Sequence, residues 1–171
     1  GMEQVPVVSF NIAGLETNPG FKITPKMAVR LVVACFYGDL IMRVLYATRP
    51  YEKVPGTCQA ILDKWHDRIV HNCLHFNPST YKKNMKGIVE DFDAVERTGE
   101  KKPKVGVVGE ILVKYHPNAN NDIVGIIESE GGEAVVLDML DFFLYGMYNK
   151  KFNYEQLSGS YKEMFINNAA I

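Results

Sequence analysis

The stretch VGVVGEILVKYHPNANNDIVGIIESEGGEAVVLDML, residues 105–140, decides the predicted fold. Its first run, 105–111, is apolar without alternation, which is typical of a strand buried on both faces of a parallel sheet. Residues 122–132 predict a helix with Ile123, Val124, Ile126 and Ile127 inward, stopped by Gly131-Gly132. Residues 133–140 predict a second buried strand. The stretch therefore predicts a βαβ unit, which is right-handed in nearly all known cases.

The preceding residues are mostly helical in pattern. Thr24-Pro25 is a helix start, because Thr caps free amides and Pro at the first position loses no hydrogen bond, and Pro50 ends this helix near Thr48. We expect a second helix capped by Thr57 and a third that follows 77–79. The core face of the second helix is Ile61, Trp65 and Ile69. The core face of the third helix is Met85, Ile88, Phe92 and Val95.

Charges stand out in the apolar first helix. Asp39 and Arg43 are four residues apart, so we expect them to pair with each other across one turn. The alternative is that both face a shared cleft.

These elements predict an α/β fold: a Rossmann-like parallel sheet with a large helical segment inserted between the first strand (5–12) and the second (105–111). Residues 1–101 form the N-terminal strand plus the helical segment, and residues 102–171 form the βαβ Rossmann-like part. Residues 98–104 are a solvated connector between them. We expect the two parts to make one compact unit, followed by a short amphipathic segment at 141–148.

The length and composition of the chain exclude several classes of protein. The chain has 171 residues, 47% of them hydrophobic, which suffices for one domain with a core. Its 19 basic residues are scattered among 20 acidic ones, so we expect no nucleic-acid partner. No apolar run reaches the roughly 18 residues of a membrane span, and no secretory signal follows Gly1-Met2, which resembles a tag remnant. These features predict a cytoplasmic protein.

The three cysteines, Cys35, Cys58 and Cys73, lie in segments predicted to be helical, and their spacing is not that of a zinc site. We therefore expect reduced thiols and no bound metal.

The polar segment 110–121 is the candidate site, because ligands of open parallel sheets settle beyond the carboxyl ends of strands. Free amides at the start of the following helix favour an anion, and Lys114 adds a charge. The alternative is a capped turn, with Tyr115 and His116 packed beneath it. Catalytic residues stay unknown, and the candidate ligand-binding residues are Gly109, Glu110, Lys114, Tyr115, Asn118, Asn120, Asn121, Asp138 and Asp141.

Two stretches carry a family resemblance: YGDLIMRVLYATRPYE (37–52) and KPKVGVVGEILVKYHPNANNDIVGIIESEGGEAVVLDMLDFFLY (102–145). They resemble the portion of acyl-CoA dehydratase activase-related proteins that is similar to a 2-hydroxyacyl-CoA dehydratase subunit. The resemblance implies a Rossmann-like fold with a helical segment, in a cytosolic system of anaerobes. There an ATP-driven activase delivers one electron to a dehydratase that carries an iron-sulfur cluster. It also implies that this chain is a domain excised from a longer protein.

One departure from the family concerns the cluster. Asp141 stands where the dehydratase subunits carry a cluster-ligating Cys, and a carboxylate is a poor substitute for a thiolate in such a cluster. We therefore expect no cofactor in this fragment, and a coenzyme A thioester as its ligand. The expected partners are acyl-CoA, the remaining domains of the parent protein, or a dehydratase or activase.

Three functions are compatible with the sequence. The leading one is a domain that binds an acyl-CoA or docks a dehydratase partner, without its own iron-sulfur cluster. The first alternative is an enzyme fragment in which Asp138, Asp141 and Lys114 do acid-base chemistry on a small carboxylate or CoA thioester. The second is a purely structural subdomain.

Overall fold

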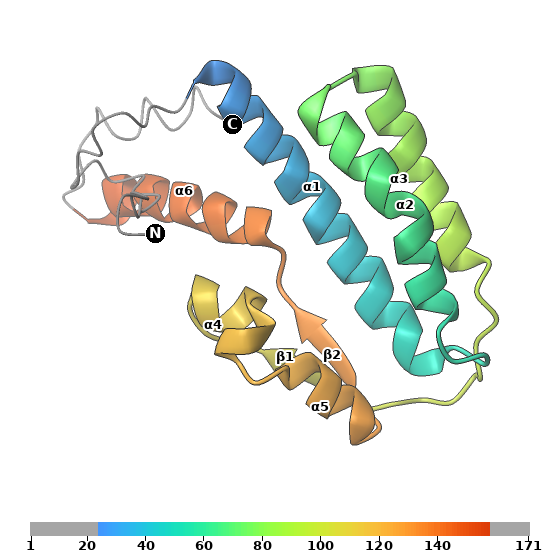
Figure 1. The fold of residues 1–171 in the computed structure, drawn as a ribbon. Helices are drawn as coiled ribbons and strands as arrows, with labels where there is room; N and C mark the ends of the chain where they lie inside the picture. The colour runs from blue at the N-terminus through green and yellow to red at the C-terminus, as the bar shows by residue number, and fades with distance from the viewer. Residues whose placement is uncertain (1–23, 158–171) are drawn as a thin grey trace, which may run out of the picture.

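The computed structural model describes residues 24–157, so the predicted strand at 5–12 lies outside the described residues. The elements follow one another in the order shown in Figure 1. They are α1 (Pro25–Thr48), the 3-10 helix η1 (Arg49–Tyr51), α2 (Thr57–Leu74), α3 (Pro78–Asp93), β1 (Lys104–Val107), α4 (Ile111–Tyr115), the 3-10 helix η2 (Pro117–Ala119), α5 (Ile123–Ser129), β2 (Glu133–Val136) and α6 (Met139–Gln156).

The predicted Rossmann-like α/β fold is wrong, because the described residues are mainly helical and contain a single sheet of two short strands. The βαβ prediction within it is confirmed. β1 and β2 pair in parallel, from Lys104 opposite Glu133 to Val107 opposite Val136, and α5 lies between them in the chain.

The strands are shorter and more open than their apolar sequence suggested. Gly109 adopts φ +151°, a conformation that side chains disfavour, and Ile111 already begins α4, so the run 105–111 does not continue as a strand. Val105 and Val135 are both exposed, and Val108 is 82% exposed. The prediction of burial on both faces is therefore wrong: an apolar run does not reveal whether helices cover it.

Helices α1, α2 and α3 pack side by side and hold the larger core, as Figure 1 shows. The side-chain oxygen of Thr24 accepts a hydrogen bond from the Met27 amide, and Pro25 is the first helical residue, as predicted. Tyr37 is fully buried, and its hydroxyl donates to Asn72 and accepts from Asn84. The polar end of this aromatic ring is thereby satisfied inside the core.

The predicted inner faces of the second and third helices are confirmed. Trp65 is buried, with Ile61 and Ile69 partly buried beside the core. On α3, Ile88 and Phe92 are almost completely buried.

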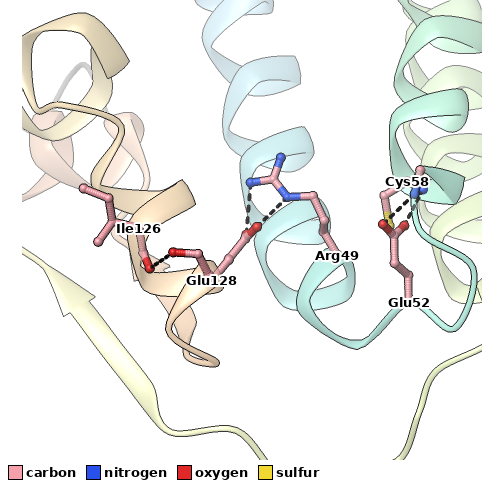
Figure 2. Close-up of polar contacts among 7 residues, drawn as sticks. Arg49, Glu52, Cys58, Ile126 and Glu128 are labelled. Atoms are coloured by element: carbon pink, nitrogen blue, oxygen red, sulfur yellow. Dashed lines mark hydrogen bonds and ion pairs between the residues drawn. The ribbon is translucent and has the colours of Figure 1, made fainter.

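The start of α2 is capped differently from the prediction. Gly56, in the left-handed conformation, is the capping residue, and Thr57 is the first helical one. The Glu52 carboxylate accepts hydrogen bonds at 2.8 Å from the Gly56 amide and from the Cys58 amide, the second of which Figure 2 shows. A side chain that precedes the helix therefore satisfies amides at its start.

Polar contacts join the helical part to the strand part. Arg49 donates two hydrogen bonds to Glu128 of α5, at 2.8 and 3.0 Å (Figure 2). The Tyr51 hydroxyl donates to Glu133 of β2 at 2.6 Å. Two-pronged arginine–carboxylate pairs fix geometry as well as distance, so the end of α1 is held against α5. The division of the chain at residue 101 stays a prediction.

Candidate functional site

The segment 110–121 is not the open loop that the sequence suggested, because it contains α4 and η2. Lys114 is buried, and its ammonium lies 4.9 Å from the centre of the Tyr115 ring. The Tyr115 hydroxyl donates to the Leu137 carbonyl at 2.7 Å. Tyr115 therefore ties the segment to the residue that follows β2, as the alternative interpretation of a packed turn expects, whereas His116 is exposed and not packed beneath the turn.

The start of α5 is capped by the chain itself. The Asn120 side-chain oxygen accepts from the Ile123 amide at 3.3 Å, and its amide group donates to the Val113 carbonyl at 2.9 Å. Asn121 takes a left-handed conformation with φ +54°. On α5 itself, Val124 and Ile127 point inward as predicted, but Ile126 is exposed. The geometry favours a cap over a ligand at Asn120.

The remaining candidates of this segment lie on the surface. Gly109 and Glu110 precede α4, Asn118 lies within η2, and all three are exposed. They are accessible, and none of them lines the cleft between α1 and β2 that Asp141 borders.

Asp39 and Arg43 do not pair with each other, so that prediction is wrong. The two oxygens of Asp39 accept from the Met139 and Leu140 amides, at 2.8 and 2.9 Å, and Arg43 pairs with Asp138. The start of α6 has free amides and a positive dipole end, which attract Asp39 more strongly than a neighbouring arginine on the helix surface. Partial burial raises the pKa of Asp138, and Arg43 opposes that rise.

A cleft of about 240 Å³ lies between α1 and β2. Its walls are largely apolar, with Met42 and Tyr46 on one side and Val135 and Leu137 on the other. Of the candidate residues predicted from the sequence, Asp141 is the one on its wall. The sequence had singled out Arg43, which also lines this cleft, and gave no signal for Tyr46 or Lys104.

The two cations at the cleft already have partners. Arg43 pairs with Asp138, and Lys104 with the buried Glu133 at 3.1 Å. Lys114 is not among the lining residues, so the trio of Asp138, Asp141 and Lys114 is not assembled in this cleft. Chemistry that needs all three groups has no support from this geometry.

Helix α6 is a larger feature than the sequence suggested. We expected a short amphipathic segment at 141–148, whereas α6 is an 18-residue helix whose amino-terminal half carries large apolar side chains on all sides and whose carboxyl-terminal half is mostly polar. These side chains, which we call the α6 surface, are between 41% and 71% exposed: Phe142, Phe143, Leu144, Tyr145, Tyr148 and Phe152. The consecutive apolar residues 142–145 point in different directions around a helix, so this helix is not amphipathic here. The eight residues used for the prediction were too few to show this.

Two general features complete the description of residues 24–157. No helix in this range is long and apolar enough to cross a membrane. Nor does the range contain a group of three or more His, Cys, Asp and Glu side chains placed to hold a metal ion, and all three cysteines are free.

Comparison of the chain with protein-family models, with curated proteins and with solved structures finds no match. The class of protein that the fold defines is thus a mainly helical domain with one parallel strand pair and a large exposed apolar helix.

Proposed function

We propose that this chain is a docking domain of an acyl-CoA dehydratase/activase-type system in the cytoplasm of an anaerobe. In this proposal the α6 surface is covered by the remaining domains of a parent protein or by a dehydratase partner. The observation that carries it is the exposure of six large apolar side chains on one helix. The family itself rests on the resemblance of residues 37–52 and 102–145.

A helix with apolar residues on all sides is normally buried, and contiguous exposed apolar patches mark interaction sites. The first turn of α6 is held firmly, because Asp39 caps it and Arg43 pairs with Asp138. The start of α6 is thereby anchored on α1, and the rest of the helix runs away from α1 (Figure 1). Aromatic side chains have few rotatable bonds, so they lose little conformational entropy on binding a partner.

The described residues support docking better than catalysis. Among them, every buried side-chain nitrogen and oxygen has a hydrogen-bond partner, so no unpaired buried group awaits a substrate. Both cations of the cleft are occupied by carboxylates. A docking surface needs neither feature.

The test is calorimetric titration of the chain with a purified 2-hydroxyacyl-CoA dehydratase and, separately, with its activase. We expect saturable binding to one of them, weakened about tenfold or more by Tyr145→Ser with Phe152→Ser, since aromatic anchors carry about 2 kcal/mol or more each. Val54→Ser is the matched control, because Val54 is 67% exposed but precedes α2. An equal loss of affinity in the Val54→Ser control, or no binding of the native chain to either protein, would refute the proposal.

A second candidate function is binding of an acyl-CoA at the α1–β2 cleft, with its phosphates at the rim of the cleft. The observation that favours it is the arginine at the rim: the Arg43 side chain is 66% exposed, whereas that of its partner Asp138 is 15% exposed. An anionic ligand can reach this guanidinium from solvent. Titration with coenzyme A, acetyl-CoA and sulfate, in the native chain, Arg43→Gln and Lys114→Ala, tests it. Binding that Lys114→Ala weakens and Arg43→Gln does not would place the ligand at the 110–121 segment instead.

A further inference from the structure

Two adjoining hollows follow the N-terminal half of α1, at the opposite end of this helix from the cleft. The first, of about 490 Å³, lies among Val29, Val32, Phe36 and the aromatic residues Phe76 and Tyr81. The second, of about 630 Å³, shares Val29 and Phe76 with the first and extends to charged residues. Together they form one surface depression, which we call the α1 groove.

The floor of the α1 groove is aromatic and fixed. The Tyr81 ring meets Phe36 and Phe76 edge-on, with centroid distances of 6.4 and 6.0 Å. Behind it lies the fully buried Tyr37, at 5.3 Å. Aromatic rings held in this way are typical anchors of protein interfaces.

One end of the α1 groove is cationic. Lys26 and Arg30 lie one helical turn apart, and His75 lines the same hollow. Within the described residues neither Lys26 nor Arg30 makes an ion pair, and α1 contains no acidic residue before Asp39. The amino end of the α1 dipole adds to the positive potential. This end of the groove therefore attracts negative charge.

We propose that the α1 groove binds an amphipathic helix of a partner protein, with apolar side chains on the aromatic floor and acidic side chains beside Lys26 and Arg30. The cationic end of the groove favours acidic side chains, and its apolar floor favours apolar side chains. An amphipathic helix carries both kinds of side chain on one segment. From Lys26 to Phe36 the groove follows eleven residues of α1, which are ten helical steps or roughly 15 Å, and this matches about three turns of a bound helix.

The shape of the groove favours a helix over a small molecule. Val29, Val32 and Phe36 retain between 43% and 50% exposure, so the groove is shallow. Sites for small ligands enclose most of the ligand surface, whereas helix-binding grooves leave one side of the helix open. This surface is separate from the α6 surface, so the inference goes beyond the proposed function and can be tested independently of it.

The experiment is fluorescence anisotropy of the full chain with labelled synthetic helical peptides of about 16 residues, long enough to cover the groove. Each peptide carries leucines at positions i, i+3, i+4 and i+7 and a pair of glutamates at its amino or its carboxyl end. A matched peptide has glutamines in place of the glutamates. We expect saturable binding of one acidic peptide, weaker binding of its glutamine version, and weakening at higher salt.

Variants locate the binding. Lys26→Glu with Arg30→Glu should weaken binding at least tenfold, and so should Val32→Asp. These side chains are exposed or half-buried, so the helices should persist, which circular dichroism checks. Lys101→Glu, an exposed charge reversal in the connector, should leave binding unchanged.

Three results would overturn the inference. The first is equal affinity for the acidic and glutamine peptides, or no effect of the groove variants. The second is a dimer in analytical ultracentrifugation that Val32→Asp dissociates, which would make the groove an interface between copies of this chain. The third is binding to vesicles of anionic phospholipid, lost in the same variants, while neither acidic peptide binds.

Discussion

The contact between Trp65 of α2 and Gly87 of α3 gives the sharpest test of the helical core. A Cβ atom added at Gly87 would lie 2.7 Å from Cη2 and 2.8 Å from Cζ2 of the Trp65 ring. The ring cannot move aside easily, because its Nε1 donates to Asp91 at 2.6 Å, and Arg68 stacks on it at 5.2 Å. Gly87→Ala should therefore overpack this interface.

Two opposing effects set the magnitude. Alanine favours a helix interior over glycine by about 1 kcal/mol. Overpacking a well-packed core costs about 1–3 kcal/mol. Gly87→Ala should thus lower the free energy of unfolding by about 0–2 kcal/mol in the native chain. In a Trp65→Leu background, where the clashing atoms are absent, the same change should raise it by about 1 kcal/mol.

The assay is urea unfolding followed by circular dichroism at 222 nm, for the four chains of a double-mutant cycle. We expect a coupling energy of about 1–3 kcal/mol between the two sites. Gly38→Ala is the matched control: beyond the adjacent residues and the local backbone of α1, no atom lies within 4 Å of the Cβ added at this glycine, so alanine should stabilise both backgrounds equally. The same effect of Gly87→Ala in both backgrounds would refute the packing of α2 on α3.

Other contacts lead to three more predictions. Asp39→Ala should lower the free energy of unfolding by about 0.5–2 kcal/mol and speed amide hydrogen exchange at the start of α6, because it removes the cap. Asp39→Asn keeps one acceptor oxygen and should lower the free energy of unfolding less. Unchanged hydrogen exchange in Asp39→Ala would exclude the cap. The hydrogen bond from Lys64, followed by that from Trp65, lowers the pKa of Asp91 below its ordinary 3.8. This carboxylate therefore stabilises the protein above about pH 4 and less as the pH falls through its folded pKa. Asp91→Asn should lower the urea midpoint at pH 7 and lower it progressively less as the pH falls below about 4, and a loss that does not change with pH would contradict the ion pair. Burial, with a further contribution from Glu52, raises the pKa of Cys58 to about 12, so at pH 8 a thiol reagent should modify Cys35 and Cys73 first, and early labelling of Cys58 would show an open core.

The sequence by itself determined where α1 begins and ends and which faces of the long helices are buried. Thr24-Pro25 predicted the start of α1 and Pro50 its end, because capping and proline geometry act within a few residues. The apolar spacing of Ile88 and Phe92 predicted the buried face of α3, because helical periodicity is also local. The parallel pairing of β1 and β2 followed from two apolar runs joined by a helix.

Only the tertiary structure decided which partners those elements meet. Asp39 lies four residues from Arg43, yet it binds amides a hundred residues further along the chain. Lys114 looked like a free ligand contact and is instead buried over Tyr115. The apolar strands are covered only in part: Val107 and Ala134 pack with α5, whereas Val105 and Val135 stay exposed. Each of these outcomes depends on competition between distant groups for the same polar or apolar surface, and that competition exists only once the chain has folded.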